Sequence, residues 1–530
     1  MDQPSCTTDK GCSYDEVPYE SQPFSQSHPD RMATIARLFG MSPPAVDHCR
    51  VLELGCAGGG NLTPMAFQLP RSEFVGIDYA QRHVQTAQEI IRDLDLKNIR
   101  VEHASILDVN ASWGSFDYII CHGVYSWVPE DVQDKIFSIC AENLSAQGIA
   151  YVSYNTYPGW HMREMIRRMM IYHTGRLTDP ARKIQQARAM IDFLARSVPT
   201  RDNAYGMLLK SELEIIKKSR DYYLFHDHLE EHNTPLYFSQ FADRMARYPL
   251  QYLGEADFHT MLSSGFSEEV RETLKRIAPD IIRAEQYMDF LRNRYFRQTL
   301  ICGKDISLKR NLTPAALDGL LVAAHIKPEH EPVDLSSGVK VTFQSTRKST
   351  LQTSRPLTKA AMVVMKEHWP RALGLEDLFR KIRKKLSIHQ AESDINTEEN
   401  RKLLKKDLLQ AYTINMVELH TYQPAFQRII PEKPKLSPLA VYQIARNRPA
   451  TSQRHESVRV DQLAQRLAPY LDGSRNRSEL SWIIRELIEQ GRLVVKKDAT
   501  PLTAADLTEE ILDGMVDRVL HNLAGSALLV

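Results

Sequence analysis

VLELGCAGGGNL, residues 51–62, decides the fold: four strand-like residues run directly into a loop that holds four glycines within six positions. Glycine lets a chain turn sharply and approach a ligand with no side chain in the way. A strand that ends in such a loop and continues into a helix usually binds a ligand through its backbone. The candidate ligands are NAD or FAD, a nucleoside triphosphate and S-adenosylmethionine.

The spacing of the glycines separates these ligands. The triphosphate pattern G-x-x-x-x-G-K-[ST] is excluded because no lysine follows Gly60. The dinucleotide pattern is a weak match, because Ala57 stands where the backbone would have to approach a pyrophosphate most closely. The acidic-x-G-x-G-x-G loop of Rossmann-like methyltransferases fits Glu53, Gly55 and Gly59. Ala57 departs from this pattern too, but S-adenosylmethionine brings a methionine tail and no diphosphate.

Four further apolar stretches follow the loop at intervals typical of an α/β domain. They are RSEFVGIDYA (71–80), NIRVEHAS (98–105), FDYIICHGVYSWV (116–128) and GIAYVSYN (148–155). The last two are almost continuously apolar, as parallel strands covered on both faces should be. The sequence therefore predicts a doubly wound α/β fold with a Rossmann-like class I methyltransferase sheet.

The expected cofactor, S-adenosyl-L-methionine, lies at the carboxyl ends of these strands. Asp78 follows Gly55 by 23 residues, near the distance at which an acid at the end of the second strand takes the ribose hydroxyls. Ser105 and Ile106 follow the third strand, where the adenine edge is usually met. The full set of expected cofactor contacts is Glu53, Gly55, Cys56, Ala57, Gly59, Asn61, Asp78, Tyr79, Ser105, Ile106 and His122.

Aromatic and amide side chains cluster after the fourth and fifth strands, on the side of the fold that faces the methyl group. An amine acceptor such as lysine has a reference pKa of about 10.4 and must be neutral before it attacks. Burial among aromatic rings lowers that pKa, and a carbonyl or carboxylate can then take the proton. The catalytic candidates are Tyr125, Asn155, Tyr157 and Trp160; Asn155 opens an NTYP motif similar to the N-P-P-Y motif of amino-group methyltransferases.

Composition sets limits on partners and location. Lysine and arginine number 67 against 66 acids, so the net charge of +1 gives no global attraction to nucleic acid or anionic membrane. The absence of a signal pattern and of a long apolar run predicts a cytoplasmic chain without membrane insertion. Seven cysteines without a C-x-x-C pair favour a reducing compartment, and neither they nor HDHLEEHN predict a metal site.

The five strands expected so far do not complete a class I methyltransferase sheet. Residues 160–220 predict only helices, so the remaining strands must lie beyond residue 225. The stretch 237–258 predicts a helix and a strand, and NRYFRQTLICGK (293–304) the antiparallel return strand. His226, Asp227, Glu230 and Asn233 would then lie over the acceptor cleft. The predicted segments are a cofactor-covering segment at 1–45, the methyltransferase domain at 46–160 and 233–305, a helical insertion at 161–232, and winged-helix-like α+β domains at 306–430 and 431–530.

Several motifs together resemble one family. SYDEVPYESQPFSQSHPDRMATIARLFGM (13–41), the glycine loop, CHGVYSWVP (121–129), YNTYPGW (154–160) and HLEEHNTPLYFSQF (228–241) resemble bacterial methyltransferases with a methyltransferase regulatory domain, including the rickettsial-type protein-lysine methyltransferases. The resemblance implies a protein substrate methylated on lysine side chains, a dimerisation region, and Tyr14, Tyr19 and His28 as cover for the cofactor.

Two other functions stay open at this point. The first is a regulator that senses S-adenosylmethionine and binds DNA through its winged helices, for which RKIRKKL (380–386) is the basic cluster that could contact the duplex. The second is a methyltransferase for RNA or a small molecule. The aromatic cluster after the fourth and fifth strands favours an enzyme that methylates a protein amine, and nucleic acid is the less favoured partner.

Overall fold

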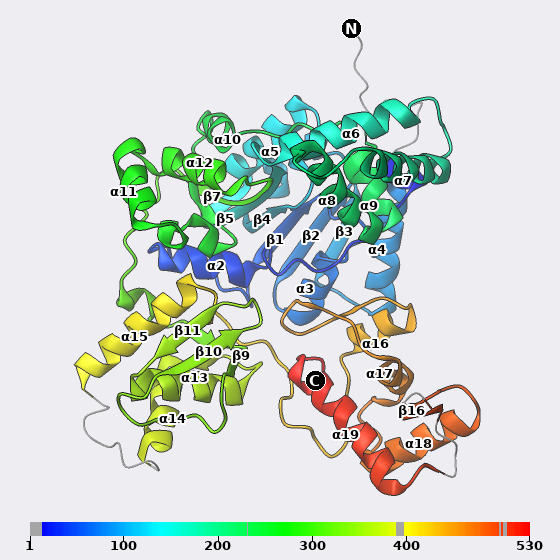
Figure 1. Ribbon diagram of the computed structural model, residues 1–530, viewed down its shortest axis with the longest axis vertical. Coiled ribbons are helices and arrows are strands. Elements are labelled where there is room, and N and C mark those ends of the chain that lie inside the picture. Colours follow the sequence, from blue (N-terminus) through cyan, green and yellow to red (C-terminus); the bar gives the residue numbers. More distant parts are fainter. Residues whose placement is uncertain (1–12, 231, 388–396, 498–499, 502–505) are drawn as a thin grey trace. The chain divides into compact units, whose positions relative to one another are not determined.

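The protein folds as two compact units (Figure 1). The structure, a computed structural model, describes residues 13–230, 232–387, 397–497, 500–501 and 506–530. In these ranges the first unit comprises residues 13–22, 35–66 and 71–308, and the second comprises residues 23–34, 67–70 and the chain from 309 onward. Residues 1–12, the start of the predicted cofactor-covering segment, lie outside the described residues.

A seven-stranded sheet forms the centre of the first unit. Its order is β3-β2-β1-β4-β5-β7-β6, with β1 to β5 parallel and β7 antiparallel to both of its neighbours. The predicted class I methyltransferase sheet is confirmed, including its last two strands. The strands are β1 (Arg50–Leu54), β2 (Glu73–Asp78), β3 (Ile99–His103), β4 (Phe116–Cys121), β5 (Leu144–Asn155), β6 (Leu250–Glu255) and β7 (Phe296–Gly303).

Helices with one apolar face pack against this sheet. In α5 the side chains of Ile136, Phe137 and Cys140 are buried at i, i+1 and i+4, a spacing that lines one side of a helix. Phe137 joins Phe241 of α10 and Tyr154 of β5 in an aromatic core, in which the last two rings stack at 4.1 Å. The helices of this unit outside the insertion are α1 (Ser13–Glu16), α3 (Leu62–Gln68), α4 (Gln81–Asp93), α5 (Glu130–Asn143), α10 (Phe238–Met245), α11 (Glu268–Ile277) and α12 (Ile281–Arg292).

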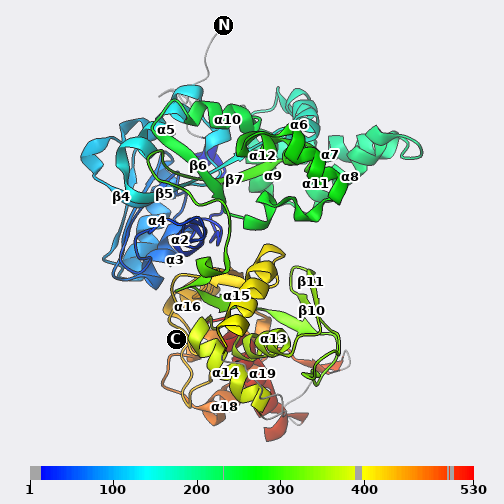
Figure 2. The same cartoon turned by 90° about the vertical axis from the view of Figure 1, so that its left-hand side faces the viewer.

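Four helices are inserted between β5 and α10: α6 (Trp160–Thr174), α7 (Pro180–Ser197), α8 (Ala204–Lys218) and α9 (Asp221–His228). Asp179 caps α7 by accepting the N–H of Arg182, and Asn203 caps α8. The four helices share a core of their own that includes Ile166, Ile191 and Phe225. Figure 2 shows α7 and α8 extending away from the strands. No helix in the described ranges is both long and apolar enough to span a bilayer.

A buried arginine fixes the last two strands. Arg297 of β7 is fully buried and contacts Glu255 of β6 at 2.6 Å, Glu285 of α12 at 2.9 Å and Asp289 of α12 at 2.8 Å. Its guanidinium also lies 3.7 Å from the centre of the Phe238 ring. One side chain therefore joins both strands and two helices, at a place where no water is available to replace its bonds.

Replacing this arginine should destabilise the first unit. In Arg297→Met the three buried acids would keep only Arg294, which lies 3.9 Å from Glu255, 3.8 Å from Glu285 and 3.3 Å from Asp289. We expect the free energy of unfolding to fall by about 3–5 kcal/mol. Chemical denaturation measures this change. Arg283→Met, on the exposed side of α12, is the matched control and should change it by less than about 0.5 kcal/mol. Equal stability of Arg297→Met and the wild type would contradict the assignment.

The middle of the chain forms the first part of the second unit. Helices α13 (Pro356–His368), α14 (Leu375–Ser387) and α15 (Glu398–Thr413) pack with strands β12 (Leu373–Gly374) and β13 (Glu418–His420), and β8 (Leu321–Ala323) pairs between these strands. The order α13-β12-α14-α15-β13 is that of a winged helix whose third strand comes from upstream. A separate sheet holds β9 (Ile326–Pro328) and the hairpin of β10 (Val341–Ser345) and β11 (Thr350–Thr353).

The C-terminal part of the second unit is also built like a winged helix. Helices α17 (Gln462–Leu467) and α18 (Arg477–Glu489) precede a small hairpin of β16 (Lys496–Lys497) and β17 (Thr500–Pro501). Asn476 and Glu479 form a capping box at the start of α18. Helices α16 (Pro438–Ala445) and α19 (Glu509–Gly525) and strands β14 (Ala450–Thr451) and β15 (Ser457–Val458) complete this part.

A short N-terminal stretch also belongs to the second unit. Helix α2 (Pro29–Leu38) is capped by His28 and not by Asp30, since His28 Nδ1 accepts the Asp30 N–H at 3.1 Å. The Asp30 carboxylate instead accepts bonds from His420 at 2.7 Å and from the Thr421 N–H at 2.6 Å. Position 28 therefore lies in the second unit, and the expectation that His28 covers the cofactor stays a prediction.

Candidate active site

The glycine loop adopts a conformation that few residues other than glycine accept. Gly55, Ala57 and Gly59 all have left-handed φ angles, of +72°, +46° and +73°. A Cβ atom at Gly55 would lie 2.5 Å from a methyl carbon of Val124, so the loops after β1 and β4 meet with no space to spare. The backbone N–H groups of Gly55 and Cys56 both donate to the carbonyl of Ile77, each at 2.9 Å. The loop is thus fixed against the end of β2.

Asp78, at the end of β2, forms hydrogen bonds both with this loop and with the residue that precedes α4. Its Oδ2 accepts the N–H of Ala57 at 2.8 Å, and its Oδ1 accepts the N–H of Ala80 at 2.9 Å. The Tyr19 N–H donates to His83 Nε2 at 3.1 Å, so His83 Nδ1 carries the proton and donates to Asp78 Oδ1 at 3.2 Å. A carboxylate has about four lone-pair positions. Three are occupied, which leaves Asp78 room for one more donor.

The N-terminal segment contacts both the glycine loop and the start of α4. Ser21 Oγ accepts the Gly60 N–H at 2.8 Å, and a Cβ atom at Gly60 would lie 2.4 Å from the Ser21 carbonyl oxygen. Asp15 Oδ1 accepts the backbone N–H of Arg82, in the first turn of α4, at 3.0 Å. Sequence patterns gave no signal for these contacts, because each joins residues that are 39 to 67 positions apart.

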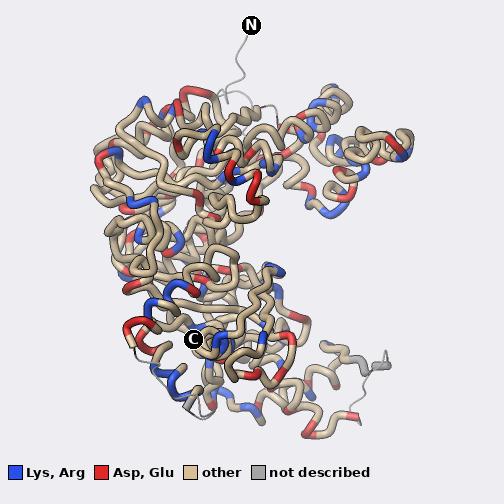
Figure 3. Tube along the Cα trace, turned by 60° about the vertical axis from the view of Figure 1, so that its left-hand side comes forward, with Lys and Arg blue, Asp and Glu red and all other residues tan. Residues whose placement is uncertain are grey.

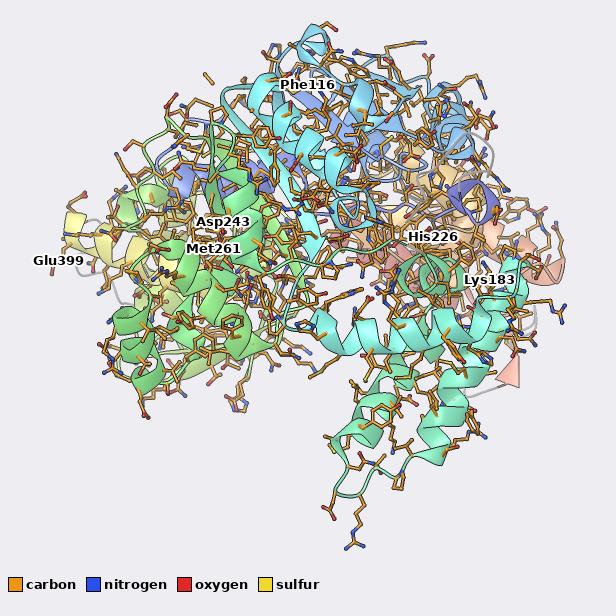
Figure 4. All side chains as sticks on the ribbon, turned by 90° about the horizontal axis from the view of Figure 1, so that it is seen from above. Phe116, Lys183, His226, Asp243, Met261 and Glu399 are labelled. Atoms are coloured by element: carbon orange, nitrogen blue, oxygen red, sulfur yellow. The ribbon has the colours of Figure 1, made fainter. Side chains whose placement is uncertain are left out.

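Helix α9 of the insertion also contacts the N-terminal segment, through His226. His226 Nε2 donates to the Val17 carbonyl at 2.6 Å, and the His226 ring stacks on Tyr14 at 4.1 Å. The Tyr14 ring also meets the edge of His83 at 5.9 Å. Figure 4 shows His226 beside the N-terminal segment. The rings of His226, Tyr14 and His83 thus link α9 of the insertion to Asp78, because His83 donates a hydrogen bond to that carboxylate.

Glu53 is a buried carboxyl with an unmet hydrogen-bonding capacity. Its Oε1 accepts the Asn61 side-chain N–H at 2.7 Å, whereas no group among the described residues donates to its buried Oε2. Burial raises the pKa of Glu53 to about 8, against the lowering effect of the Asn61 bond. Such a group fits a ligand that brings a positive charge, as the ammonium of S-adenosylmethionine would.

The remaining expected cofactor residues lie at the same edge of the sheet. Tyr79 directly follows Asp78 and is 47% exposed. Ser105 uses its hydroxyl to cap the short helix at 106–108, which contains Ile106. His122, after β4, has its Nδ1 2.8 Å from the Tyr151 hydroxyl, and burial lowers its pKa to about 4, so its ring is neutral at pH 7.

Of the four catalytic candidates, Tyr125 is not available to a ligand. A helical turn at Tyr125–Trp127 follows β4 and sends the Tyr125 ring into the aromatic core beside Phe137 and Phe241, where it is fully buried. The structure therefore gives a catalytic role of Tyr125 no support. Trp127, two positions on, is only partly buried and meets the Trp160 ring edge to face at 6.3 Å. The sequence did not distinguish these two rings because both follow the same strand.

Trp160 and Tyr157 form an aromatic wall after β5. The Trp160 ring is 3% exposed, and its buried Nε1 has no acceptor among the described residues. The Arg163 guanidinium lies over the rings of Trp160 and Tyr295. Tyr157 stacks on His161 at 3.9 Å. The wall thus combines apolar faces with one unpaired buried donor.

Asn155, at the end of β5, is held in one orientation. Its side-chain nitrogen donates to Asn233 Oδ1 at 3.0 Å, and the Asn233 nitrogen lies 3.5 Å from Glu164 of α6. No group in the described part of the chain donates to Asn155 Oδ1, so this oxygen remains able to accept. The loop carrying Asn233 is fixed by the Thr234 N–H, which donates to the Ser126 carbonyl at 2.7 Å.

Among the residues expected over the acceptor cleft, Asp227 is the one whose pKa is clearly shifted. Burial raises its pKa to about 7, although the charge of Arg163 opposes this change. Tyr14, Tyr19 and Tyr223 are close enough for the Asp227 charge to raise their own pKa values. The Glu230 backbone carbonyl accepts a bond from the buried Arg167 guanidinium, which anchors the loop after α9. Asp227 is thus a carboxyl that can gain or lose a proton near neutrality.

Three family models match successive parts of the chain. A methyltransferase domain matches residues 45–220, a predicted methyltransferase regulatory domain matches residues 220–303, and the PKMT C-terminal winged helix domain matches residues 432–528. The regulatory match contains β6 and β7, so the region of that name completes the methyltransferase sheet.

Relatives cover nearly the whole chain. An uncharacterized protein of Rickettsia prowazekii (strain Madrid E) is 36% identical over 525 residues, which is 98% of this chain and 93% of the relative. A second protein of that organism is 39% identical over 241 residues, 46% of this chain and 96% of the relative. The structure of PKMT2 from Rickettsia typhi in complex with AdoHcy covers 97% of this chain and 100% of its own, with a TM-score of 0.85 and 30% identity. The chain belongs to the S-adenosylmethionine-dependent methyltransferases that combine a class I methyltransferase domain, a methyltransferase regulatory domain and a PKMT C-terminal winged helix domain.

Proposed function

We propose that the enzyme transfers methyl groups from S-adenosylmethionine to lysine amines of a protein. The observation that carries this proposal is the edge-to-face pair of Trp127 and Trp160 together with the oriented amide of Asn155, at the ends of β4 and β5. Tyr157 lies in the same turn after β5 as Trp160. In a class I sheet the methyl group is presented at this edge. Apolar faces with one oriented carbonyl suit a long aliphatic side chain that ends in an amine.

The cofactor supplies an electrophilic methyl group on a sulfonium, and the chain's own residues hold it. We assign Asp78 to a ribose hydroxyl, Glu53 to the ammonium, and the backbone of Gly55 to Gly59 to the methionine tail. Tyr79, Ser105 and Ile106 are the proposed adenine contacts. Cys56, Asn61 and His122 support this set: Asn61 through its bond to Glu53, and the other two through their positions after β1 and β4.

The acceptor amine has to lose a proton before it attacks. Burial of the acceptor amine among the rings of Trp127, Trp160 and Tyr157 favours its neutral form, because the charged form is less stable away from water. Asn155 Oδ1 can then accept a remaining N–H and point the lone pair at the methyl carbon. Asp227, with a pKa near 7, is the proposed receiver of the released proton.

Cofactor binding should release a proton near neutral pH. Glu53, with a pKa of about 8, is mostly protonated at pH 7 in the free protein, and an adjacent ammonium would stabilise the carboxylate and lower that pKa. We expect release of up to one proton per bound S-adenosylhomocysteine at pH 7, and progressively less as the pH rises through about 8. Calorimetry in two buffers of different ionisation enthalpy measures the release.

Glu53→Gln is the matched variant for this measurement. It keeps the shape of the side chain and cannot ionise, so the proton release should disappear and affinity should fall by roughly tenfold or more, which corresponds to loss of a charge-assisted bond of about 1.5–3 kcal/mol. Identical proton release from Glu53→Gln and the wild type would rule out Glu53 as the source.

The acceptor class can be tested with methyl-labelled cofactor and a native lysate. We expect the label on lysine side chains of protein, located by mass spectrometry. Trp160→Ala and Asn155→Ala should each lower kcat/KM by at least about tenfold while leaving S-adenosylhomocysteine affinity within about twofold. Tyr125→Phe, in the core, is the matched aromatic control and should stay within about twofold of wild type. Label on RNA or on a metabolite would overturn the proposal.

The insertion supports a homodimer as part of this proposal. Tyr172, Phe193 and Met207, on three of its helices, are 91%, 65% and 62% exposed, and apolar side chains this exposed are candidates for an interaction site. Phe193→Glu should shift the protein toward monomer in sedimentation velocity, because the charge would have to be buried in the interface. Gln185→Glu, also exposed on α7, should leave the oligomeric state unchanged. A wild-type monomer at micromolar concentration would refute the interface.

The basic helix α14 gives the DNA-binding alternative no support. Arg380 and Lys381 contact Asp377, and Lys385 contacts Glu367, so acids on the same unit offset much of its charge. Figure 3 shows basic and acidic positions interspersed along the chain. We therefore keep methyl transfer to protein as the single proposed function.

A further inference from the structure

Three side chains form a row of hydrogen bonds that ends at the candidate acceptor site. Asn155 Nδ2 donates to Asn233 Oδ1 at 3.0 Å, and Asn233 Nδ2 donates to Glu164 Oε2 at 3.5 Å. Asn155 ends β5, Asn233 lies in the loop before α10, and Glu164 lies on α6 of the insertion. All three belong to the first unit. We call Asn155, Asn233 and Glu164 the amide relay.

The backbone at both amides is held by hydrogen bonds. The Asn155 N–H donates to Ser126 Oγ at 2.9 Å, and the Asn155 carbonyl accepts the Leu236 N–H at 3.2 Å. Beside Asn233, the Thr234 N–H donates to the Ser126 carbonyl at 2.7 Å. The two side chains therefore start from fixed positions, and what is left to decide is which way each amide group faces.

Glu164 decides the direction of both amides. An amide group has nearly the same shape whichever way it turns, but one end donates and the other accepts, whereas a carboxylate only accepts. Asn233 must therefore give its NH2 group to Glu164 and present its oxygen to Asn155. Asn155 must in turn give its NH2 group to Asn233, which leaves Asn155 Oδ1 for the methyl acceptor. The reversed row would set two acceptor oxygens against each other at Glu164.

Two arginines fix the orientation of the Glu164 carboxylate. Arg168 Nε lies 2.6 Å from Glu164 Oε1, and Arg167 Nη1 lies 3.4 Å from the same oxygen. Both arginines come from the next turn of α6, at i+3 and i+4, where side chains of a helix meet. Because the two guanidinium groups take Oε1, it is Oε2 that faces Asn233.

The direction of the Asn155 amide matters for the reaction. A neutral amine attacks with its lone pair, which has to point at the methyl carbon. When Asn155 Oδ1 faces the amine, the amide accepts an N–H and leaves the lone pair free. In the reversed direction the Asn155 NH2 group would donate to that lone pair and occupy it. The same residue would then hold the amine in an unreactive arrangement.

We propose that Glu164 is a positioning residue for methyl transfer, which acts through Asn233 to keep Asn155 Oδ1 directed at the acceptor amine. This inference rests on the proposed transfer to lysine and on the proposed role of Asn155. It adds a residue of the inserted helix α6, two side chains away from the amine, to the requirements of the reaction.

Glu164→Gln should reverse the amide relay. Arg167 and Arg168 can only donate, so they keep the single oxygen of the new side chain, and its NH2 group turns toward Asn233. We expect the apparent kcat for label transfer to lysate protein to fall at least about tenfold at saturating S-adenosylmethionine, with S-adenosylhomocysteine affinity within about twofold of wild type. Glu214→Gln, at an exposed ion-paired glutamate of α8, is the matched control and should keep the wild-type rate.

Asn155→Asp tests the direction itself. Alone, its carboxylate would meet Asn233 Oδ1, acceptor against acceptor, and we expect a loss of at least about tenfold. Combined with Glu164→Gln, the reversed relay ends on that carboxylate: one oxygen accepts the Asn233 NH2 group and the other can accept from the amine. The double variant should therefore be at least about fivefold more active than either single variant, a coupling between two residues that do not bond to each other.

The outcomes separate this inference from the proposed function. If the wild type labels protein lysines while Glu164→Gln keeps the wild-type rate, or while the two losses multiply in the double variant, the inference alone is overturned. Loss of S-adenosylhomocysteine binding in Glu164→Gln would assign Glu164 a structural role and also overturn it. Label from the wild type on RNA or on a metabolite would overturn the proposed function and this inference together.

Discussion

The hydrogen bond from the Ala57 N–H to the Asp78 carboxylate is the interaction on which the cofactor end of the fold depends. It holds an alanine in a left-handed conformation that ordinarily disfavours any residue with a Cβ atom. The same carboxylate receives His83, which in turn receives the N–H of Tyr19 from the N-terminal segment. One acid therefore fixes the loop beneath the cofactor and orients the segment above it.

The candidate site for the methyl acceptor depends on other contacts. Its residues come from the sheet, from the helical insertion and from the region that matches the methyltransferase regulatory domain. Asn155 ends a strand of the sheet, but Asn233 fixes its amide and Glu164 of α6 supports Asn233. The regulatory match at 220–303 includes the loop with Asn233 and the strands β6 and β7. That region is thus part of the sheet and of the candidate site, and separating it would expose β5 as an edge.

Buried charge has two distinct uses in this chain. Arg297 with its three acids is fully paired and joins strands and helices that lie far apart in sequence. Glu53 and Asp227 make no ion pair among the described residues, and burial raises their pKa values to about 8 and 7. Burial also raises the pKa of Glu285 to about 7 in spite of Arg297, so the two groups of acids differ in their contacts and not in the direction of the pKa shift. Paired groups of the first kind stabilise one arrangement, whereas the second kind is suited to a ligand that brings charge or a proton.

The sequence by itself determined the sheet, the cofactor loop and the acid at the end of β2, because buried parallel strands must be apolar throughout and left-handed turns select glycine. It also located β6 and β7 from local composition. Only the tertiary structure decided that Tyr125 enters the core while Trp127 does not, that His28 caps a helix in the second unit, and that His83 orients Asp78. Each of these depends on contacts between distant residues, and local sequence carries no record of which partner a side chain will meet.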